Sequence, residues 1–391
     1  MKKKILITIA TLLLVFGSIG YFLYVKYNEV PNVISSFNEN GVLFNLDDSE
    51  FNNKLFYSQL DDKAKLYYQC LYNSSKEYDI SFTYLFEHDE NSLDKALRAF
   101  SFDWPQYYWW DEILDEKIII ENNLGKKFVY YKITSNTDSK EDVTNDGELI
   151  VNEGLKIANE VKSDNDYETI KNLHDYIINN VTYDEDVLVS QDLRSVLLNK
   201  VGVCAGYSEA FQYVANILGY DCYSVTGETI PEQANGVFHE WNIIHIGDNW
   251  YWVDNTWDEI IDEDDNEVNI GYEYFLASSS AFMINHILPN DFLYPECKDD
   301  SLYYLNMPGK LIYNLDENEI ETFVTECIKN GYHTIELKFI NNDNGLSTYD
   351  WLDNNGFFDL YEKNISETYS LGCLWQYDEG SQFLEIYWYY N

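Results

Sequence analysis

Residues 201–211 read VGVCAGYSEAF, and they predict the element on which the fold interpretation rests. Beyond Cys204, apolar residues recur at helical spacing as far as Leu218, and Gly219 follows where a C-terminal cap is expected. The pattern therefore predicts a helix that begins at Cys204, after a tight turn at Gly202. The free N–H groups and the positive dipole end of a helix N-terminus favour the thiolate form of a cysteine and can hold an oxyanion.

Two strands downstream complete the predicted site. Residues 238–246 (FHEWNIIHI) and 250–254 (WYWVD) flank the turn sequence GDN, so they predict an antiparallel hairpin. His239 opens the first strand and Asp254 closes the second, which places both at the same open end. A carboxylate there can orient an imidazole, and the imidazole can activate a thiol. We therefore expect an α+β core in which the Cys204 helix packs on an antiparallel sheet that carries His239 and Asp254.

Three motifs in this region resemble a known family. VCAGYSEAF, HEWN and VDNTWD occur in the order found in the transglutaminase-like superfamily. They are most similar to its bacterial membrane-anchored branch and to cytokinesis-associated eukaryotic relatives. Residues 170–184 and 275–286 also resemble that branch, so the match covers roughly residues 165–290.

The resemblance implies a papain-like fold and a catalytic triad. In that triad Cys204 is the nucleophile, His239 is the base and Asp254 orients the base. The sequence departs from the family at Glu240, where a small residue is common, and at Asn255, where proline is common. Neither position carries the chemistry, and the chemistry itself requires no cofactor.

Three aromatic residues are candidates for the walls of a substrate pocket. Tyr207 lies three residues after the nucleophile and points back over the first helical turn, where it could shape the pocket or simply pack. Trp241 and Trp257 could line an acyl-donor groove or pack under the hairpin.

Carboxylates beside the motifs could position a lysine amine: Glu240, Asp258 and Glu259. A solvated rim formed by the same residues is the alternative that the sequence leaves open. Three further histidines are expected to be hydrogen-bonded structural residues: His174, His245 and His286.

The net charge of -43, from 68 acidic and 25 basic residues, disfavours nucleic acid as a partner. We expect a protein or peptide substrate. The six cysteines form no CxxC or Cys/His cluster, so no zinc site is predicted. The acidic run at residues 262–267 approaches EF-hand spacing, but Glu267 stands where the loop requires glycine. No metal site is therefore expected.

The N-terminus predicts a membrane anchor. Lys2, Lys3 and Lys4 precede an uncharged run at residues 5–25, which is long enough to cross a hydrocarbon core of roughly 30 Å. The lysines favour a short cytoplasmic tail, residues 1–4, and an extracytoplasmic catalytic region at the cell membrane. A cleaved signal peptide is the alternative.

The polar, breaker-rich stretch at residues 134–148 predicts a domain boundary. We expect an N-terminal accessory region at 30–148, a catalytic domain at 149–297 and a C-terminal α+β accessory domain at 300–391. Helices are predicted at 61–71, 149–161, 167–180, 316–329 and within 349–362, and strands at 117–120, 127–133, 312–315, 334–340, near Cys373 and at 383–389.

Three functions remain open at this stage. The first is a cell-envelope thiol enzyme that transfers or hydrolyses acyl groups at amide bonds through a Cys204 thioester. The second is a cysteine protease that acts on envelope peptides with the same residues. The third is a catalytically idle scaffold or binding protein for envelope or division assembly.

Overall fold

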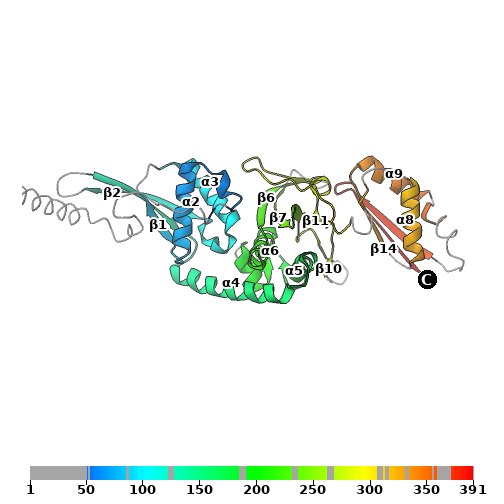
Figure 1. Ribbon diagram of the computed structural model, residues 1–391, viewed down its shortest axis with the longest axis horizontal. Helices are drawn as coiled ribbons and strands as arrows, with labels where there is room; N and C mark the ends of the chain where they lie inside the picture. Colours follow the sequence, from blue (N-terminus) through cyan, green and yellow to red (C-terminus); the bar gives the residue numbers. More distant parts are fainter. Residues whose placement is uncertain are drawn as a thin grey trace, which may run out of the picture. The chain divides into compact units, whose positions relative to one another are not determined.

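The computed structural model describes residues 51, 53–84, 88–121, 127–184, 191–230, 237–261, 268–305, 311–312, 317–330, 334–354, 356–358 and 371–390 (Figure 1). The chain divides into two compact units, Met1–Asp103 with Tyr107–Gly147, and Trp104–Gln106 with Glu148–Asn391. The predicted anchor at residues 5–25 and the acidic run at 262–267 lie outside the described residues. Within the described ranges, no helix is both long and apolar enough to span a membrane.

The first unit combines two helices with a three-stranded antiparallel sheet of order β1-β3-β2. Its elements are η3 (Tyr57–Gln59), α2 (Asp62–Ser75), β1 (Ser81–Tyr84), α3 (Glu90–Asp103), β2 (Ile113–Glu121) and β3 (Lys127–Ser135). The Asp61 carboxylate caps α2 by accepting from the Ala64 N–H at 2.9 Å. The predicted helix at 61–71 and the two predicted strands are confirmed.

Helix α4 (Lys140–Val161) corrects the predicted start at residue 149. Its first turn is stabilised by Ser139, whose N–H and hydroxyl donate to the Asp142 carboxylate at 3.3 and 2.6 Å. Glu141 and Asp142 also complement the helix dipole. These capping features extend the helix back into the polar stretch that the sequence analysis interpreted as a loop.

The second unit contains a five-stranded antiparallel sheet of order β11-β8-β7-β6-β12. Its strands are β6 (Cys222–Thr229), β7 (Val237–Ile246), β8 (Asn249–Val253), β11 (Phe275–Ala277) and β12 (His286–Ile287). Strands β7 and β8 form the predicted hairpin, with Asn242 opposite Val253 and Gly247 in the turn at φ +62°. A positive φ is readily adopted only by glycine, which explains this residue in the turn.

Helix α6 (Cys204–Leu218) packs on β6 and β7 (Figure 1). It begins at Cys204 and ends at Gly219, which has a φ of +98°, as predicted. The Ser224 N–H of β6 donates to the buried Gln212 side chain at 2.8 Å and fixes the helix on the sheet. Helix α5 (Asp166–Asn180) packs against α6, and its side-chain cap is Asn165.

The remaining elements of the two units, apart from the C-terminal sheet and its helices, are short. They are η4 (Pro105–Trp110), β4 (Thr182–Tyr183), η5 (Ser195–Asn199), β5 (Val201–Gly202), β9 (Glu259–Ile261), β10 (Val268–Ile270) and α7 (Ser279–Phe282). Gly206 lets residues 191–196 approach the first turn of α6, because a Cβ at this position would lie 2.9 Å from Val196 and 3.0 Å from the Asp192 carbonyl oxygen.

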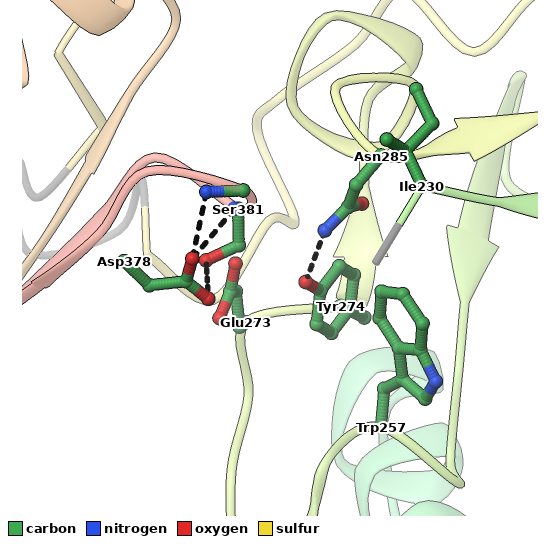
Figure 2. A pocket seen from close by; sticks show the side chains of 8 residues that line it. Ile230, Trp257, Glu273, Tyr274, Asn285, Asp378 and Ser381 are labelled. Atoms are coloured by element: carbon green, nitrogen blue, oxygen red, sulfur yellow. Dashed lines mark hydrogen bonds between the residues drawn. The ribbon is translucent and has the colours of Figure 1, made fainter. Parts of the chain in front are cut away.

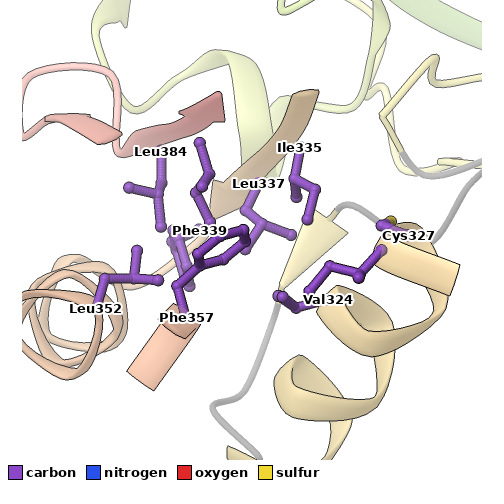
Figure 3. Close-up of a cluster of buried hydrophobic side chains, with 10 residues drawn as sticks. Val324, Cys327, Ile335, Leu337, Phe339, Leu352, Phe357 and Leu384 are labelled. Atoms are coloured by element: carbon purple, nitrogen blue, oxygen red, sulfur yellow. The ribbon is translucent and has the colours of Figure 1, made fainter. Parts of the chain in front are cut away.

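The C-terminal part of the second unit is a four-stranded sheet of order β13-β14-β16-β15 with two helices. Its elements are β13 (Leu311–Ile312), α8 (Glu317–Lys329), β14 (Thr334–Phe339), α9 (Asn342–Asp353), β15 (Leu371–Asp378) and β16 (Phe383–Tyr390). Figure 3 shows its core, in which Leu337 and Phe339 of β14 lie between Val324 of α8 and Leu352 of α9. Burial of these apolar side chains therefore packs the two helices against the sheet.

Helix α9 corrects a second prediction. A helix was expected within residues 349–362, but α9 starts earlier, at Asn342, and ends at Asp353. The Asn341 side chain caps it by accepting from the Asp343 N–H at 2.9 Å. The other predicted C-terminal elements that fall on described residues are confirmed.

Lys338 of β14 carries a charge but is fully buried, in a strand that is otherwise mostly apolar. Its Nζ lies 2.6 Å from Glu273 Oε1 and 5.3 Å from the centre of the Tyr274 ring. Glu273 and Tyr274 immediately precede β11, so the ion pair joins the C-terminal sheet to the central sheet.

Candidate active site

Cys204 is the first residue of α6 and is partly exposed. Two buried hydrogen bonds fix this end of the helix against β7: the Ser208 hydroxyl donates to the Glu240 carbonyl at 2.8 Å, and the Asn242 amide donates to the Ser208 carbonyl at 2.9 Å. Val203, which precedes the helix at the N-cap position, provides no side-chain cap. The N–H groups of the first turn are thus not covered by a capping side chain, unlike those of α2, α5 and α9.

His239 and Asp254 meet as the hairpin requires. His239 lies on β7 and is 7% exposed, and Asp254 follows β8 and is fully buried. His239 Nε2 lies 2.7 Å from Asp254 Oδ2, and the Cys204 side chain is close enough to raise the pKa of the imidazole. Because Nε2 is engaged by Asp254, Nδ1 is the nitrogen that remains for the thiol. The structure therefore brings together all three residues of the predicted triad.

The charges in this cluster reinforce one another. Burial lowers the pKa of His239, but the Asp254 carboxylate and the Cys204 side chain raise it more strongly, to about 10. Burial raises the pKa of Asp254, yet the two imidazoles of His239 and His286 hold it well below its usual range. At neutral pH this arrangement favours an imidazolium beside a carboxylate, which is the partner that a thiolate requires.

Asp254 is held by four hydrogen bonds. Its Oδ1 accepts from the N–H groups of Thr256 at 3.0 Å and Trp257 at 3.1 Å, and its Oδ2 contacts His239 and His286. A buried carboxylate with this many partners has a fixed position and can fix the imidazole in turn.

His286, which was predicted to be a structural histidine, contacts the triad directly. Its Nε2 lies 3.1 Å from the same Asp254 oxygen that His239 contacts. Residue spacing gave no reason to place it there, because β12 reaches the site by pairing with β6. The resemblance of residues 275–286 to the family was the signal that pointed to this segment.

Among the described residues, His239, Asp254 and His286 also form a group that could hold a metal ion, with ligand atoms within 4.8 Å of one another. Their direct separations of 2.7 and 3.1 Å are hydrogen-bond lengths. The three groups therefore satisfy one another through shared protons.

Of the three candidate pocket residues, Trp257 lines a cavity of about 260 Å³ (Figure 2). Its ring stacks on His239 with centroids 5.3 Å apart and an interplanar angle of 25°. The other side of the cavity is formed by Asp378 and Ser381 in the turn between β15 and β16. Trp257 thus contacts both the cavity and His239, whereas His239 itself does not line the cavity.

Tyr207 and Trp241 are both fully buried. The Trp241 ring packs edge-on against His286 at 4.8 Å. The Tyr207 ring packs against Tyr183 at 6.1 Å, and burial raises its pKa well above the usual range. Both residues support the site from inside the core.

Of the three carboxylates that could position an amine or form a solvated rim, Glu240 and Asp258 are buried and do neither. Glu240 is buried, as alternation along β7 turns it away from the face of His239, and it accepts from the Thr226 hydroxyl at 3.1 Å. Asp258 is 1% exposed and lies 3.1 Å from His174 Nε2. Its carboxylate therefore pairs with a structural histidine and is not available to an amine.

His174 and His245 fit the expectation of structural residues. His174 is fully buried between Asp258 and Asp175, at 3.1 and 3.2 Å. The His245 ring packs against Trp250 with centroids 4.8 Å apart.

Comparisons with known proteins match this geometry to a family. The transglutaminase-like superfamily matches residues 155–255, a segment that includes Cys204, His239 and Asp254. Kyphoscoliosis peptidase of Mus musculus is 27% identical over 97 residues, which are 22% of this chain and 15% of that protein. The likeness to this relative thus spans less than a fifth of its length.

Solved structures with a partial likeness include the following two. The crystal structure of a TGase is 18% identical with a TM-score of 0.26, and the match covers 45% of this chain and 50% of that one. A putative cysteine protease from Cytophaga hutchinsonii is 22% identical with a TM-score of 0.24, covering 37% of this chain and 64% of that one. Residues 155–255, which contain Cys204, His239 and Asp254, are therefore the part of the chain that is similar to the transglutaminase-like superfamily.

Proposed function

We propose that this protein is a thiol enzyme of the cell envelope that attacks amide carbonyls through Cys204. The observation that carries the proposal is the single chain of contacts from Cys204 to His239 and from His239 to the buried Asp254. The thiol stands at an uncapped helix N-terminus, and the imidazole beside it is charged at neutral pH.

The reaction follows from these positions. The Cys204 thiolate adds to the carbonyl carbon, and the N–H groups of the first turn of α6 are the donors available to the resulting oxyanion. The His239 imidazolium gives its proton to the leaving amine, and the C–N bond breaks to leave a thioester. His239 then takes a proton from water or from a second amine as that nucleophile attacks the thioester, which restores the thiolate and the imidazolium.

Hydrolysis is the favoured outcome of the second step, with amine incorporation as a lesser product. Water is present at about 55 M, so an amine competes only if a site positions it. The carboxylates expected to do so at Glu240 and Asp258 are committed within the fold. The cavity beside Trp257 contains Glu273 and Asp378, but Glu273 is already paired with Lys338.

The same residues also serve a cysteine protease, which remains the second candidate. The mouse relative is named a peptidase, and this favours the alternative. The protease differs from the first candidate only in the amide that it selects. A catalytically idle scaffold for envelope or division assembly is the third.

The test is incubation of the full-length protein with a glutamine-containing acceptor protein and a labelled primary amine, with Cys204→Ala as the matched control. Ammonia release that depends on Cys204 is expected, with a smaller incorporation of label. Cleaved backbone would instead support the protease. No Cys204-dependent product on any envelope substrate would favour the scaffold and contradict the proposal.

The proposed location rests on the sequence of residues 1–26, which predicts an uncleaved single-pass anchor of the membrane-anchored branch. Protease added to cells stripped of outer barriers should then digest the bulk of the chain. Full protection of the chain contradicts this location, and release of the protein into the medium indicates a cleaved signal peptide.

A further inference from the structure

We propose that His286 is a positioning residue for the Cys204–His239 pair, and that its Nε2–H donates to Asp254 and holds that carboxylate against His239. The inference rests on the proposed function, because it gives His286 a task only if Cys204 is the nucleophile. His286 does not contact the reacting atoms, and it acts through Asp254.

The His286 ring is sealed inside the core. The residue is 1% exposed, and its ring packs against Phe282 at 4.0 Å, Trp257 at 4.7 Å and Trp241 at 4.8 Å between centroids. Solvent cannot satisfy the two ring nitrogens at such a site. Each must find its hydrogen-bond partner within the protein.

The contact with Asp254 determines which nitrogen carries the hydrogen. An ionised carboxylate can only accept, so a nitrogen 3.1 Å from Asp254 Oδ2 must donate. Burial lowers the pKa of His286, which keeps the ring neutral and leaves it with a single N–H. In a neutral ring that donates from Nε2, Nδ1 must accept.

Of the two described groups that lie within hydrogen-bond distance of Nδ1, only the Asn285 side chain can donate to it. The Phe282 carbonyl, 3.2 Å away, can only accept, whereas the Asn285 side-chain amide lies 2.9 Å away and can present either of its ends. The two ends of an amide are distinguished by the hydrogen bonds that they make. The neutral ring therefore selects the orientation in which the Asn285 NH₂ group donates to His286.

The chain of donors then continues to Tyr274. As placed in the structure, the Asn285 amide nitrogen lies 2.9 Å from the Tyr274 hydroxyl, a bond drawn in Figure 2, and the amide oxygen faces His286 Nδ1. The direction derived above exchanges these two ends of the amide. Burial raises the pKa of Tyr274 well above its usual range, so this hydroxyl keeps its hydrogen and can donate to the Asn285 carbonyl oxygen. One consistent direction of hydrogen bonds thus runs from Tyr274 through Asn285 and His286 to Asp254.

Several titratable groups surround this chain. Asp254 and His239 act on His286, and Glu273, Asp254 and Asp258 act on Tyr274. The Lys338 ammonium lies over the Tyr274 ring and is paired with Glu273. Removal of the His286 donor should act most directly on Asp254, because Asp254 is the acceptor of its hydrogen bond.

The experiment compares His286→Gln, which retains an N–H donor, with His286→Leu, which has none. The rate of Cys204 alkylation is measured from pH 4 to 10 on the full-length protein, together with the thermal unfolding midpoint. We expect the leucine variant to label at least about tenfold more slowly at pH 7 and the glutamine variant to recover most of the rate. The pKa of Asp254 should rise once a donor is lost. In the His286→Leu variant, the fall of the alkylation rate at acid pH should therefore move to a higher pH by roughly one unit.

A structural role alone would lower the unfolding midpoint of both variants and leave the acid limb in place, which would overturn the proposal. If His286→Leu does not fold, Asn285→Leu retains the histidine but removes its donor at Nδ1, and it should give a smaller loss of the same kind. A wild-type labelling rate that changes on treatment with EDTA would also overturn the proposal, in favour of a metal on His239, Asp254 and His286.

A direct test uses the protein labelled with ¹⁵N at its six histidines. The His286 signals should show a protonated Nε2 and an unprotonated Nδ1 at pH 7, and a hydrogen on Nδ1 contradicts the inference. The proposed function has a separate control, His239→Ala. If that change leaves Cys204 labelling unaffected, the triad itself fails, whereas a normal triad with a fully active His286→Leu removes only the role of His286.

Discussion

The central sheet and the C-terminal sheet of the second unit bury different kinds of side chain. The C-terminal core consists of apolar residues from β14, β16, α8 and α9, including Leu337, Phe339 and Leu384 (Figure 3). The central sheet buries His239, Asp254 and other titratable groups. Burial of apolar surface stabilises the fold directly, whereas a buried charge is tolerated only where hydrogen bonds replace water.

The difference distinguishes a core held by apolar burial from a site held by hydrogen bonds between buried polar groups. Four hydrogen bonds satisfy Asp254, and His286 is one of its partners. The C-terminal core needs no such network, although Lys338 and Glu273 form one ion pair at its edge. Substitutions in the two regions should therefore differ in what they change.

The largest effect is expected from Asp254→Asn. The change removes the negative charge that raises the pKa of His239, so the imidazolium beside the thiolate is lost at pH 7. Alkylation of Cys204 should slow by about 10²-fold, within the range of general acid–base contributions. Mass-spectrometric mapping after brief alkylation measures this, with the buried Cys222 as the internal reference. Faster labelling of Cys222 than of Cys204 in the wild type would contradict the assignment of the nucleophile.

Leu337→Ala should lower the stability of the fold and leave the reactivity of Cys204 unchanged. Leu337 is fully buried among apolar side chains, so its truncation should cost about 2–5 kcal/mol of unfolding free energy. Cys204 labelling of the folded protein should not change. Urea unfolding measures the cost, and Leu374→Ala on β15 is the matched control, because Leu374 is 66% exposed. Equal costs for the two substitutions would mean that the C-terminal core is not packed as described.

The pH dependence of stability should also differ between the regions. The folded pKa of His239 is raised to about 10, so its contribution is fully present below an unfolded pKa of about 6.5 and is lost as the pH rises through 10. The pKa of Asp254 is lowered, so its contribution is present above about pH 3.9 and is lost in stronger acid.

The unfolding free energies of the wild type and His239→Gln, measured at pH 5.5, 8 and 10, should thus converge as the pH rises. The cost of Leu337→Ala should stay constant over the same range. A constant difference for His239→Gln would indicate that the imidazole is neutral in the folded protein.

The smallest effect is expected from Gly219→Ala at the far end of α6. Gly219 has a φ of +98°, and a Cβ would meet no atom within 4 Å, so only backbone strain opposes the change. The cost should be about 1 kcal/mol in urea unfolding, without a change in Cys204 labelling. A large loss of labelling would mean that the whole helix, and not only its first turn, sets the position of the thiol.

Local patterns in the sequence predicted the elements that position the site. The spacing from Cys204 to Gly219 gave the helix, and a tight turn at Gly247 was enough to bring His239 and Asp254 to one end of a hairpin. The catalytic roles of these residues remain predictions. They follow from chemistry that the geometry supports, and the alkylation experiments address them.

Features that depend on long-range pairing or on capping were missed. His286 approaches Asp254 because β12 joins the edge of β6, a contact between segments 57 residues apart at His286 and Thr229 that no periodicity reveals. Helices α4 and α9 begin earlier than expected, because Ser139 and Asn341 cap their first turns. The predicted pocket residue Trp241 instead fills the space beside Gly227, where a Cβ would lie 2.4 Å from its ring.

The buried pair of Lys338 and Glu273 has a consequence for protein engineering. Truncation of the chain after residue 305 removes Lys338 and leaves the Glu273 carboxylate beside Tyr274 without its cation. A shortened version of the protein should therefore carry Glu273→Gln, which keeps the shape of the side chain and removes the unpaired charge. The transglutaminase-like domain and the sheet that follows it are thus one unit for design purposes, even though the family match ends at residue 255.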